Sequence, residues 1–180
     1  MVSESENEKI QNVRFEEISS SQYLKPIRMY FERRSQNLFW DLAVEQDSVA
    51  CIIFHKDKDS LLFVKQFRPP VFIRKVREFP ENQRKKIEEI KFENYEISLG
   101  KTIELCAGLM DKPNLTPLQT VQEEILEECG YKVPENKIKL IKKLISNVSI
   151  SGSFQYLFYA EIDESQKATE GGGNVSEGEF

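Results

Sequence analysis

The sequence has 180 residues, of which 39% are hydrophobic and 31% are charged, enough for one domain with a hydrophobic core. Its net charge of -5 and isoelectric point near 5.2 argue against a nucleic-acid-binding surface, which is normally basic. No hydrophobic run reaches the roughly 18–20 residues that cross a bilayer, and the acidic N-terminus lacks the apolar core of a signal peptide. We therefore expect neither nucleic acid nor a membrane as a partner.

The cysteines and the single histidine indicate the redox compartment and limit the kinds of metal site that the chain can form. Cys51, Cys106 and Cys129 are scattered through apolar segments, which predicts buried thiols in a reducing compartment, by default the cytoplasm. His55 is the only histidine and is predicted to end a strand before a turn. Because zinc sites need His and Cys ligands at short spacings, the sequence does not predict one.

The N-terminal quarter predicts a leader followed by antiparallel strands. Residues 1–12 are polar and are expected to form a disordered leader, and residues 13–18 alternate as a candidate strand. Two longer candidate strands, 27–33 and 38–44, flank the segment 34–37. This arrangement predicts a β-hairpin.

The next segment predicts central strands and then a charged insertion. Residues 48–55 and 61–68 are apolar strand candidates joined by a polar turn, and two prolines stop the second strand after Arg68. Arg68 is thus expected at a strand end, facing away from the core, a place that suits a surface ion pair. Residues 77–100 mix both charges densely and predict a surface insertion with helical tendency over 81–92.

The stretch 104–131 contains the strongest local signals, which predict a short strand, a loop and one capped helix. Thr116 is a good N-cap residue, Pro117 suits the first helical position, and Gln119 completes a capping box. Gly130 suits the position just past the C-terminus, where a left-handed residue ends a helix. We therefore expect a helix that begins at Pro117 and ends before Gly130.

The acidic residues of this helix are crowded. Glu124 and Glu128 are four residues apart, and Glu127 lies one turn from Glu124. Like charges at this spacing are unfavourable by roughly 0.2–0.5 kcal/mol per pair, and they lie at the helix end where the macrodipole favours cations. No lysine or arginine occurs between residues 113 and 131. A bound divalent cation would remove the conflict, and a solvated acidic face is the alternative.

Three further strands are predicted around this helix, over 102–107 before it and over 137–146 and 154–162 after it. The tail from Asp163 to Phe180 is polar and contains three consecutive glycines. Such a composition predicts a mobile segment.

Six residues match the Nudix box, G-x5-E-x7-R-E-U-x-E-E-x-G-U with U aliphatic or aromatic: Gly108, Glu124, Glu127, Glu128, Gly130 and Tyr131. The flanking segments 104–108 and 64–70 narrow the resemblance to the branch of the Nudix family that acts on nucleoside diphosphate sugars. The resemblance extends from about residue 20 to the end of the chain and covers most of it.

The chain departs from the general box at two positions. Leu115 stands where the first glutamate would fall, after a loop that is one residue longer, as expected in this branch. Glu123 stands at the arginine position, and that arginine normally holds a neighbouring box carboxylate in place. This charge reversal keeps open the alternative of a catalytically impaired Nudix-fold binding module.

The resemblance implies an α+β Nudix fold, a mixed β-sheet sandwiched between helices with an N-terminal antiparallel β-sheet extension. Accordingly, we assign 1–12 to the leader, 13–45 to an N-terminal β dimerisation region and 46–180 to the Nudix domain. The extension implies a homodimer. Relatives are expected to continue beyond Phe180 with a strand and a long helix that this sequence lacks.

The resemblance also implies a reaction, the Mg2+-dependent hydrolysis of the pyrophosphate bond of a nucleoside diphosphate sugar, with Mn2+ as an alternative metal. UDP-glucose would give UMP and glucose 1-phosphate. ADP-ribose or another nucleotide sugar is the alternative substrate. Val148 and Ser153 replace the proline and glutamate of the ADP-ribose branch, which disfavours ADP-ribose.

The implied metal ligands are the backbone carbonyl of Ala107 and the side chains of Glu124, Glu127 and Glu128, with Glu127 also acting on water. The implied substrate contact is that of Arg68 with the diphosphate. Trp40 and Tyr23 are candidates for stacking on the base, although core packing or a dimer contact would also explain them. The implied catalytic base is Glu177 or Glu179, and a solvated tail is the alternative for that segment.

Overall fold

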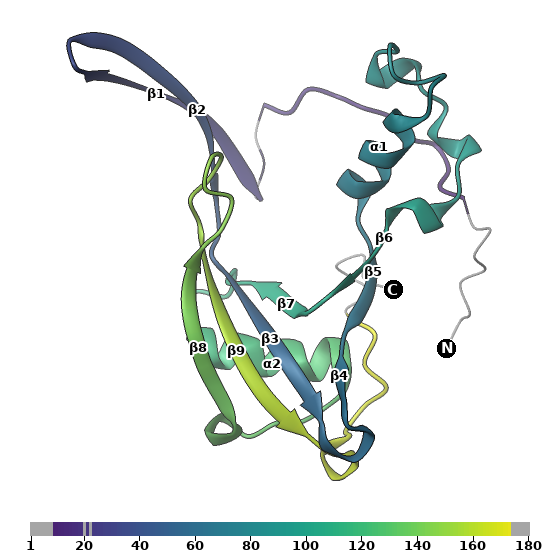
Figure 1. Ribbon diagram of the computed structural model, residues 1–180, viewed down its shortest axis with the longest axis vertical. Helices are drawn as coiled ribbons and strands as arrows, with labels where there is room; N and C mark the ends of the chain where they lie inside the picture. The colour runs from purple at the N-terminus through teal and green to yellow at the C-terminus, as the bar shows by residue number, and fades with distance from the viewer. Residues whose placement is uncertain (1–8, 20, 22, 174–180) are drawn as a thin grey trace. The chain divides into compact units, whose positions relative to one another are not determined.

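The computed structural model describes residues 9–19, 21 and 23–173, whose course is drawn in Figure 1. These residues form two compact units. One unit takes the described residues up to Ile18 together with Lys65–Glu104, and the other takes those of Ser19–Val64 together with those from Leu105 onward. Helices and strands occur together in the described chain, which confirms the α+β class.

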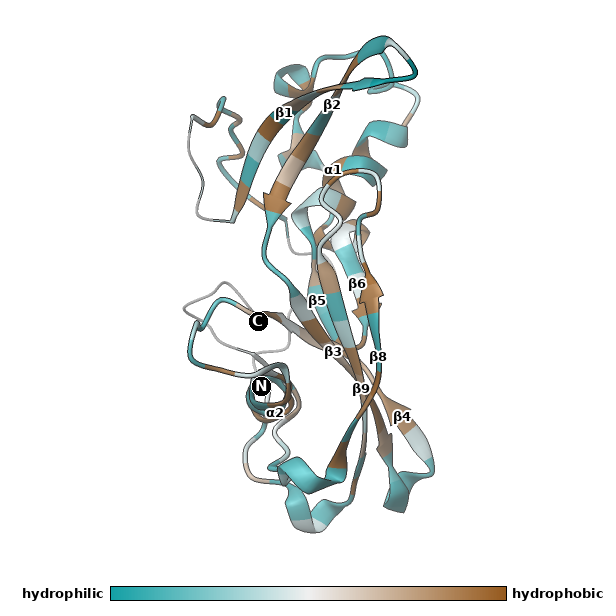
Figure 2. Cartoon of the chain, turned by 90° about the vertical axis from the view of Figure 1, so that its left-hand side faces the viewer, coloured by the Kyte–Doolittle hydropathy of each residue, from teal (hydrophilic) through white to brown (hydrophobic). Residues whose placement is uncertain are grey.

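The predicted N-terminal hairpin is present and is longer than expected. Strand β1 (Leu24–Arg33) pairs antiparallel with β2 (Gln36–Glu45) along its whole length. The two residues between them, Arg34 and Ser35, have φ angles of 53° and 58°. Two consecutive positive φ values are typical of the type I′ turn, whose twist suits a two-residue hairpin. Hydrophobic residues recur along both strands (Figure 2).

The second unit also contains a mixed five-stranded sheet. Its centre is β3 (Ser48–His55), which pairs parallel with β9 (Phe154–Ile162) on one side and antiparallel with β4 (Ser60–Leu62) and β7 (Cys106–Leu109) on the other. Strand β8 (Ile138–Ile145) pairs antiparallel with β9 at the edge of the sheet. The nearly continuous apolar sequence of β3 suits this central position, since such strands are covered on both faces.

Helix α2 (Pro117–Cys129) forms as its sequence signals predict. The Thr116 side chain accepts a hydrogen bond from the Gln119 backbone, and the Gln119 side chain accepts one from the Thr116 N–H at 3.0 Å. Gly130 follows with φ of 78° in the left-handed region. Such an N-cap stabilises a helix by about 1 kcal/mol.

The core of this unit lies between α2 and the sheet. Val121 and Ile125 are fully buried where α2 packs against β7 and β3 on one face of the sheet (Figure 1). Cys51, Cys106 and Cys129 are buried free thiols, as predicted. Burial raises the pKa of the Cys51 thiol to about 12, so it is neutral at physiological pH. A helix on the other face of the sheet stays a prediction.

The first unit has a small hydrophobic core of its own. Strand β5 (Val64–Phe67) pairs with β6 (Lys101–Glu104), and helix α1 (Pro69–Glu78) buries Phe72 and Val76 against Phe92. No helix was expected at 69–78, because the two prolines indicated only the end of a strand. They occupy the first two helical positions instead, where the missing N–H groups cost nothing.

Four predicted elements differ from the structure. Residues 13–18 are not a strand: Val13 and Phe15 pack against the core of the first unit. The predicted strand 61–68 is divided at Phe63 between β4 and β5, and 102–107 is divided at Leu105 between β6 and β7.

The helical tendency predicted over 81–92 is confirmed only in part. This region forms turns and the short 3-10 helix Ile87–Glu89, and the 3-10 helices Phe92–Asn94 and Ile97–Gly100 follow it. The buried side chain of Asn82 donates to the Val76 carbonyl at 3.0 Å and contacts the Tyr95 hydroxyl at 2.6 Å. Hydrogen bonds of this kind favour turns over a continuous helix.

None of the described helices is both long and apolar enough to span a membrane.

Candidate active site

Glu128 is fixed to the backbone of β7. Its side chain is only 7% exposed, and its Oε2 atom accepts a hydrogen bond from the Ala107 N–H at 3.0 Å. A buried carboxylate needs such a donor, because an uncompensated charge in the interior is costly. The structure therefore brings two predicted metal ligands, Ala107 and Glu128, into contact, and the contact uses the amide of Ala107.

Glu124 lies against the next residue of the same strand. A Cβ atom added to Gly108 would lie 1.9 Å from Oε1 and 2.1 Å from Cδ of Glu124. Any other residue at 108 would therefore displace this carboxylate. The close approach explains why glycine is needed here, and it brings the carboxylates of Glu124 and Glu128 to adjacent residues of β7.

A lysine in the loop before α2 contacts the other two acids of the helix. Lys112 Nζ lies 2.7 Å from Glu123 Oε2 and 3.9 Å from Glu127 Oε1. The hydrogen bond with Glu123 is the main cause of a raised pKa for Lys112, and the charges of Glu127, Glu123 and Glu124 add to it. Lys112 lies just before residues 113–131, the stretch in which the sequence has no lysine or arginine.

The donor set of α2 fits a hard divalent cation. Among the described residues, no three His, Cys, Asp or Glu side chains already converge as a metal cage. Mg2+ does not need one, since it usually keeps several waters and takes only one or two carboxylates from the protein. Glu124, which packs against Gly108, and Glu128, which accepts the Ala107 N–H, supply such a pair of carboxylates.

Arg68 is found in the first unit, paired with Glu104. Its Nε and Nη2 atoms donate to the two Glu104 oxygens at 2.9 and 2.7 Å. The surface ion pair considered from the sequence is therefore present, and it gives Glu104 a structural role that the sequence did not assign. Arg68 follows β5 as the N-cap residue of α1, so it does lie at a strand end. Its contact with a diphosphate stays a prediction.

We expect the Arg68–Glu104 pair to make stability depend on pH. The hydrogen bonds from Arg68 are the main cause of a Glu104 pKa below its usual value of 4.5. Because the unfolded chain binds this proton more readily, the stabilisation is complete above the unfolded-state pKa and is lost as pH falls through the folded-state pKa. Arg68→Gln removes this contribution, so the difference in free energy of unfolding between about pH 7 and about pH 3 should shrink by about 1 kcal/mol or less.

Urea unfolding of the wild type and the variant at both pH values measures this change. Arg74→Gln is the matched control, because Arg74 pairs with Glu78 while both side chains are largely exposed, at 76% and 62%. The same pH dependence in the wild type and in Arg68→Gln would contradict the prediction.

Two of the remaining predicted site residues, Trp40 and Tyr23, have no described contact with these carboxylates. Trp40 lies on β2 with its side chain 53% exposed, and its Nε1 donates to the Ser149 carbonyl at 3.0 Å. Tyr23, just before β1, is 66% exposed. Neither is a core residue, so base stacking and a dimer contact both stay open. Glu177 and Glu179 lie outside the described residues.

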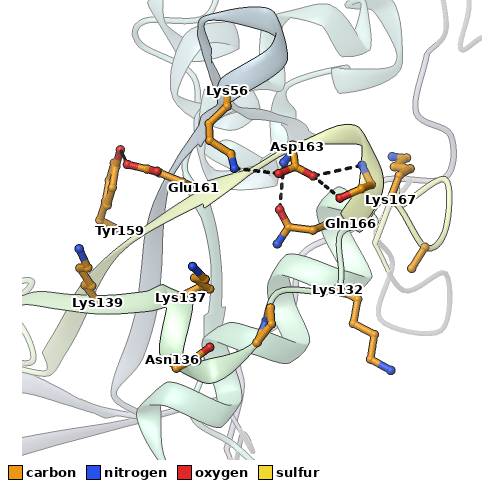
Figure 3. Close-up of a pocket in the computed structure, with 13 residues that line it drawn as sticks. Lys56, Lys132, Asn136, Lys137, Lys139, Tyr159, Glu161, Asp163, Gln166 and Lys167 are labelled. Atoms are coloured by element: carbon orange, nitrogen blue, oxygen red, sulfur yellow. Dashed lines mark hydrogen bonds and ion pairs between the residues drawn. The ribbon is translucent and has the colours of Figure 1, made fainter.

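A lysine-rich pocket of about 680 Å³ lies where β9 ends (Figure 3). Its lining includes Lys56, Lys137, Lys139 and Glu161 together with Asp163, which pairs with Lys56 at 2.8 Å. Among the described residues, the predicted metal ligands Ala107, Glu124, Glu127 and Glu128 do not line it. These predicted metal ligands lie on α2 and β7, outside the pocket.

No protein-family model matches the chain. It is 33% identical over 177 residues to the uridine diphosphate glucose pyrophosphatase NUDT14 of Bos taurus and to that of Mus musculus, alignments that cover 96% of this chain and 80% of each relative. It is 28% identical over 127 residues to the GDP-mannose pyrophosphatase of Cronobacter sakazakii, covering 71% of this chain and 53% of that protein. The chain therefore belongs to the Nudix hydrolases, in the group that contains these sugar-nucleotide pyrophosphatases.

Proposed function

We propose that this protein hydrolyses the pyrophosphate bond of a nucleoside diphosphate sugar with Mg2+ as cofactor, and that UDP-glucose is its substrate. The products would be UMP and glucose 1-phosphate. The observation that supports the activity best is that two carboxylates of α2, Glu124 and Glu128, lie against neighbouring residues of β7. The choice of UDP-glucose rests on the relatives that match 96% of the chain.

In this reaction a water oxygen bonds to one phosphorus while the bridging anhydride oxygen leaves with the sugar phosphate. A bound divalent ion would neutralise phosphate charge and make the water more acidic. Glu124 and Glu128 would hold that ion, with Glu128 kept in position by the Ala107 N–H. Glu127 is 38% exposed and would orient the water from the solvent side. Glu177 and Glu179 remain our candidates for the base that accepts the proton of the water.

Three hypotheses predict different results in one assay. Purified protein with Mg2+ is supplied in turn with UDP-glucose, GDP-mannose and ADP-ribose, and the nucleoside monophosphate released is measured. Fastest turnover of UDP-glucose supports the proposal. Preference for GDP-mannose would keep the enzyme class and change the substrate, an outcome that the bacterial relative makes worth testing. Binding without turnover would instead favour a non-catalytic module.

We also propose that the protein is a homodimer joined through its N-terminal hairpin. Pairing in register puts Met29 beside Trp40 and Ile27 beside Leu42 on one face of the hairpin, and the side chains of Met29 and Trp40 are 52% and 53% exposed. A two-stranded hairpin with an uncovered apolar face is only marginally stable alone. A second copy of the hairpin would cover it.

Met29→Lys is expected to convert the dimer to a monomer, because it inserts a charge into this face. Tyr30→Lys is the matched control: successive residues of a strand point to opposite faces, and Tyr30 is 74% exposed. Sedimentation of the wild type and both variants tests this. A wild-type monomer, or loss of the dimer in both variants alike, would contradict the proposed interface.

We propose a cytosolic location for this activity. The three cysteines are free and buried, and unpaired thiols of this kind are usual in a reducing compartment. Fractionation of cells that express the tagged protein would test it, and recovery in a secreted or organellar fraction would contradict it.

A further inference from the structure

The acids of α2 fall into two groups by the close contacts that the structure describes. Glu124 and Glu128 lie against β7, through Gly108 and the Ala107 amide. Glu123 and Glu127 instead lie near the ammonium group of Lys112, at 2.7 and 3.9 Å.

The second group contains an unfavourable pair that the lysine offsets. Glu123 and Glu127 are four residues apart on one helix, a spacing at which like charges repel. The last turn of α2 contains no basic residue. Lys112 is the cation that the described contacts bring to this pair.

We propose that Lys112 is a positioning residue of the acidic site: it neutralises Glu123 so that Glu127 stays beside Glu124 and Glu128. This inference rests on the proposed function, because the positioned group is one of the carboxylates proposed to act on metal and water. Glu123 has no metal contact in this scheme. Its charge must be cancelled only because it lies one turn from Glu127.

The proposal predicts an unusual rescue. Lys112→Ala leaves Glu123 uncompensated and should weaken Mn2+ binding about 5-fold. This is less than the roughly 10–100-fold typical of groups that support metal ligands, because these side chains are partly exposed. The double variant Lys112→Ala/Glu123→Gln removes both charges and should restore Mn2+ affinity and turnover close to wild type. Lys112→Arg should also bind Mn2+ as the wild type does.

The experiment is a calorimetric titration of Mn2+ into each purified variant without substrate, followed by turnover of UDP-glucose. Lys139→Ala is the control, since it removes the same charge from the same unit at the lysine-rich pocket. Weaker binding in Lys112→Ala together with recovery in the double variant supports the proposal. Lys112→Ala that binds Mn2+ as well as or better than wild type would overturn it, as would a double variant that stays impaired.

These outcomes are separate from those of the proposed function. If the wild type binds no Mn2+ and turns over no nucleotide sugar, the proposed function fails. If the wild type does both and Lys112→Ala is indistinguishable from it, only the role of Lys112 fails. Thermal unfolding of each variant distinguishes loss of metal binding from loss of fold.

Discussion

Glu128→Gln is expected to lower turnover at least about 100-fold while leaving the fold intact. The substitution keeps an oxygen that can accept the Ala107 N–H, now 3.0 Å from Oε2, so the junction of α2 with β7 should persist. What disappears is the negative charge that would hold the metal. Metal stabilisation of the transition state is worth several kcal/mol, and each 1.36 kcal/mol is about tenfold in rate.

The measurement is the steady-state rate of UMP release from UDP-glucose at saturating Mg2+. Glu135→Gln is the matched control, because Glu135 is exposed and begins the short helix before β8. The two variants should unfold at similar temperatures and differ only in rate. A Glu128→Gln protein with the wild-type rate would rule out metal ligation by this residue.

Gly108→Ala is expected to cause a comparable loss of activity by a different route. The added methyl group would lie 1.9 Å from Glu124 Oε1, so the carboxylate has to swing away from β7. A glutamate side chain is flexible, so this movement costs little stability, but a misplaced ligand costs about 10–100-fold in metal affinity or rate. The rate of UMP release and the Mg2+ concentration at half-maximal rate both measure this effect.

The control for Gly108→Ala is a glycine substitution with the opposite expected profile. Gly152 has φ of 65° and nothing within 4 Å of an added Cβ atom, so Gly152→Ala strains the backbone without touching a carboxylate. It should lower the unfolding temperature and keep the Mg2+ dependence of the wild type. If Gly108→Ala also kept that dependence, the close packing of Gly108 on Glu124 would have no bearing on the site.

Helix α2 could be predicted from the sequence because its signals are local. The Thr116–Gln119 capping box and the left-handed Gly130 each act only on residues a few positions away. The N-terminal hairpin was predictable for the same reason, since its strands are separated by a two-residue turn. The correct prediction of α2 also placed Glu124, Glu127 and Glu128 on one helix.

Contacts between distant segments were not predictable in this way. Lys112 meets Glu123 eleven residues later, and Arg68 meets Glu104 thirty-six residues later. No periodicity records such a pairing. Helix α1 was missed because prolines after a strand are equally compatible with a stop and with the first turn of a helix.

The contacts at β7 lie between these cases. The Nudix resemblance named Ala107, Gly108 and the helix acids as one site, whereas propensity alone would have left them as a strand and an acidic helix. The structure adds how they meet. The Ala107 N–H donates to the Glu128 carboxylate, and Gly108, which has no side chain, leaves room for the Glu124 carboxylate. The resemblance implies that the carbonyl of Ala107 is a ligand, and that remains a prediction.

Calorimetric titration of Mn2+ into the wild type and into Glu124→Gln/Glu128→Gln tests most directly whether the acids of α2 hold a divalent ion. We expect the wild type to bind Mn2+ at micromolar to millimolar concentration, on the order of other partly hydrated carboxylate sites, and the double variant to lose that binding while remaining folded. No uptake by the wild type at millimolar Mn2+, or equal uptake by both proteins, would contradict the metal site and the hydrolysis proposed from it.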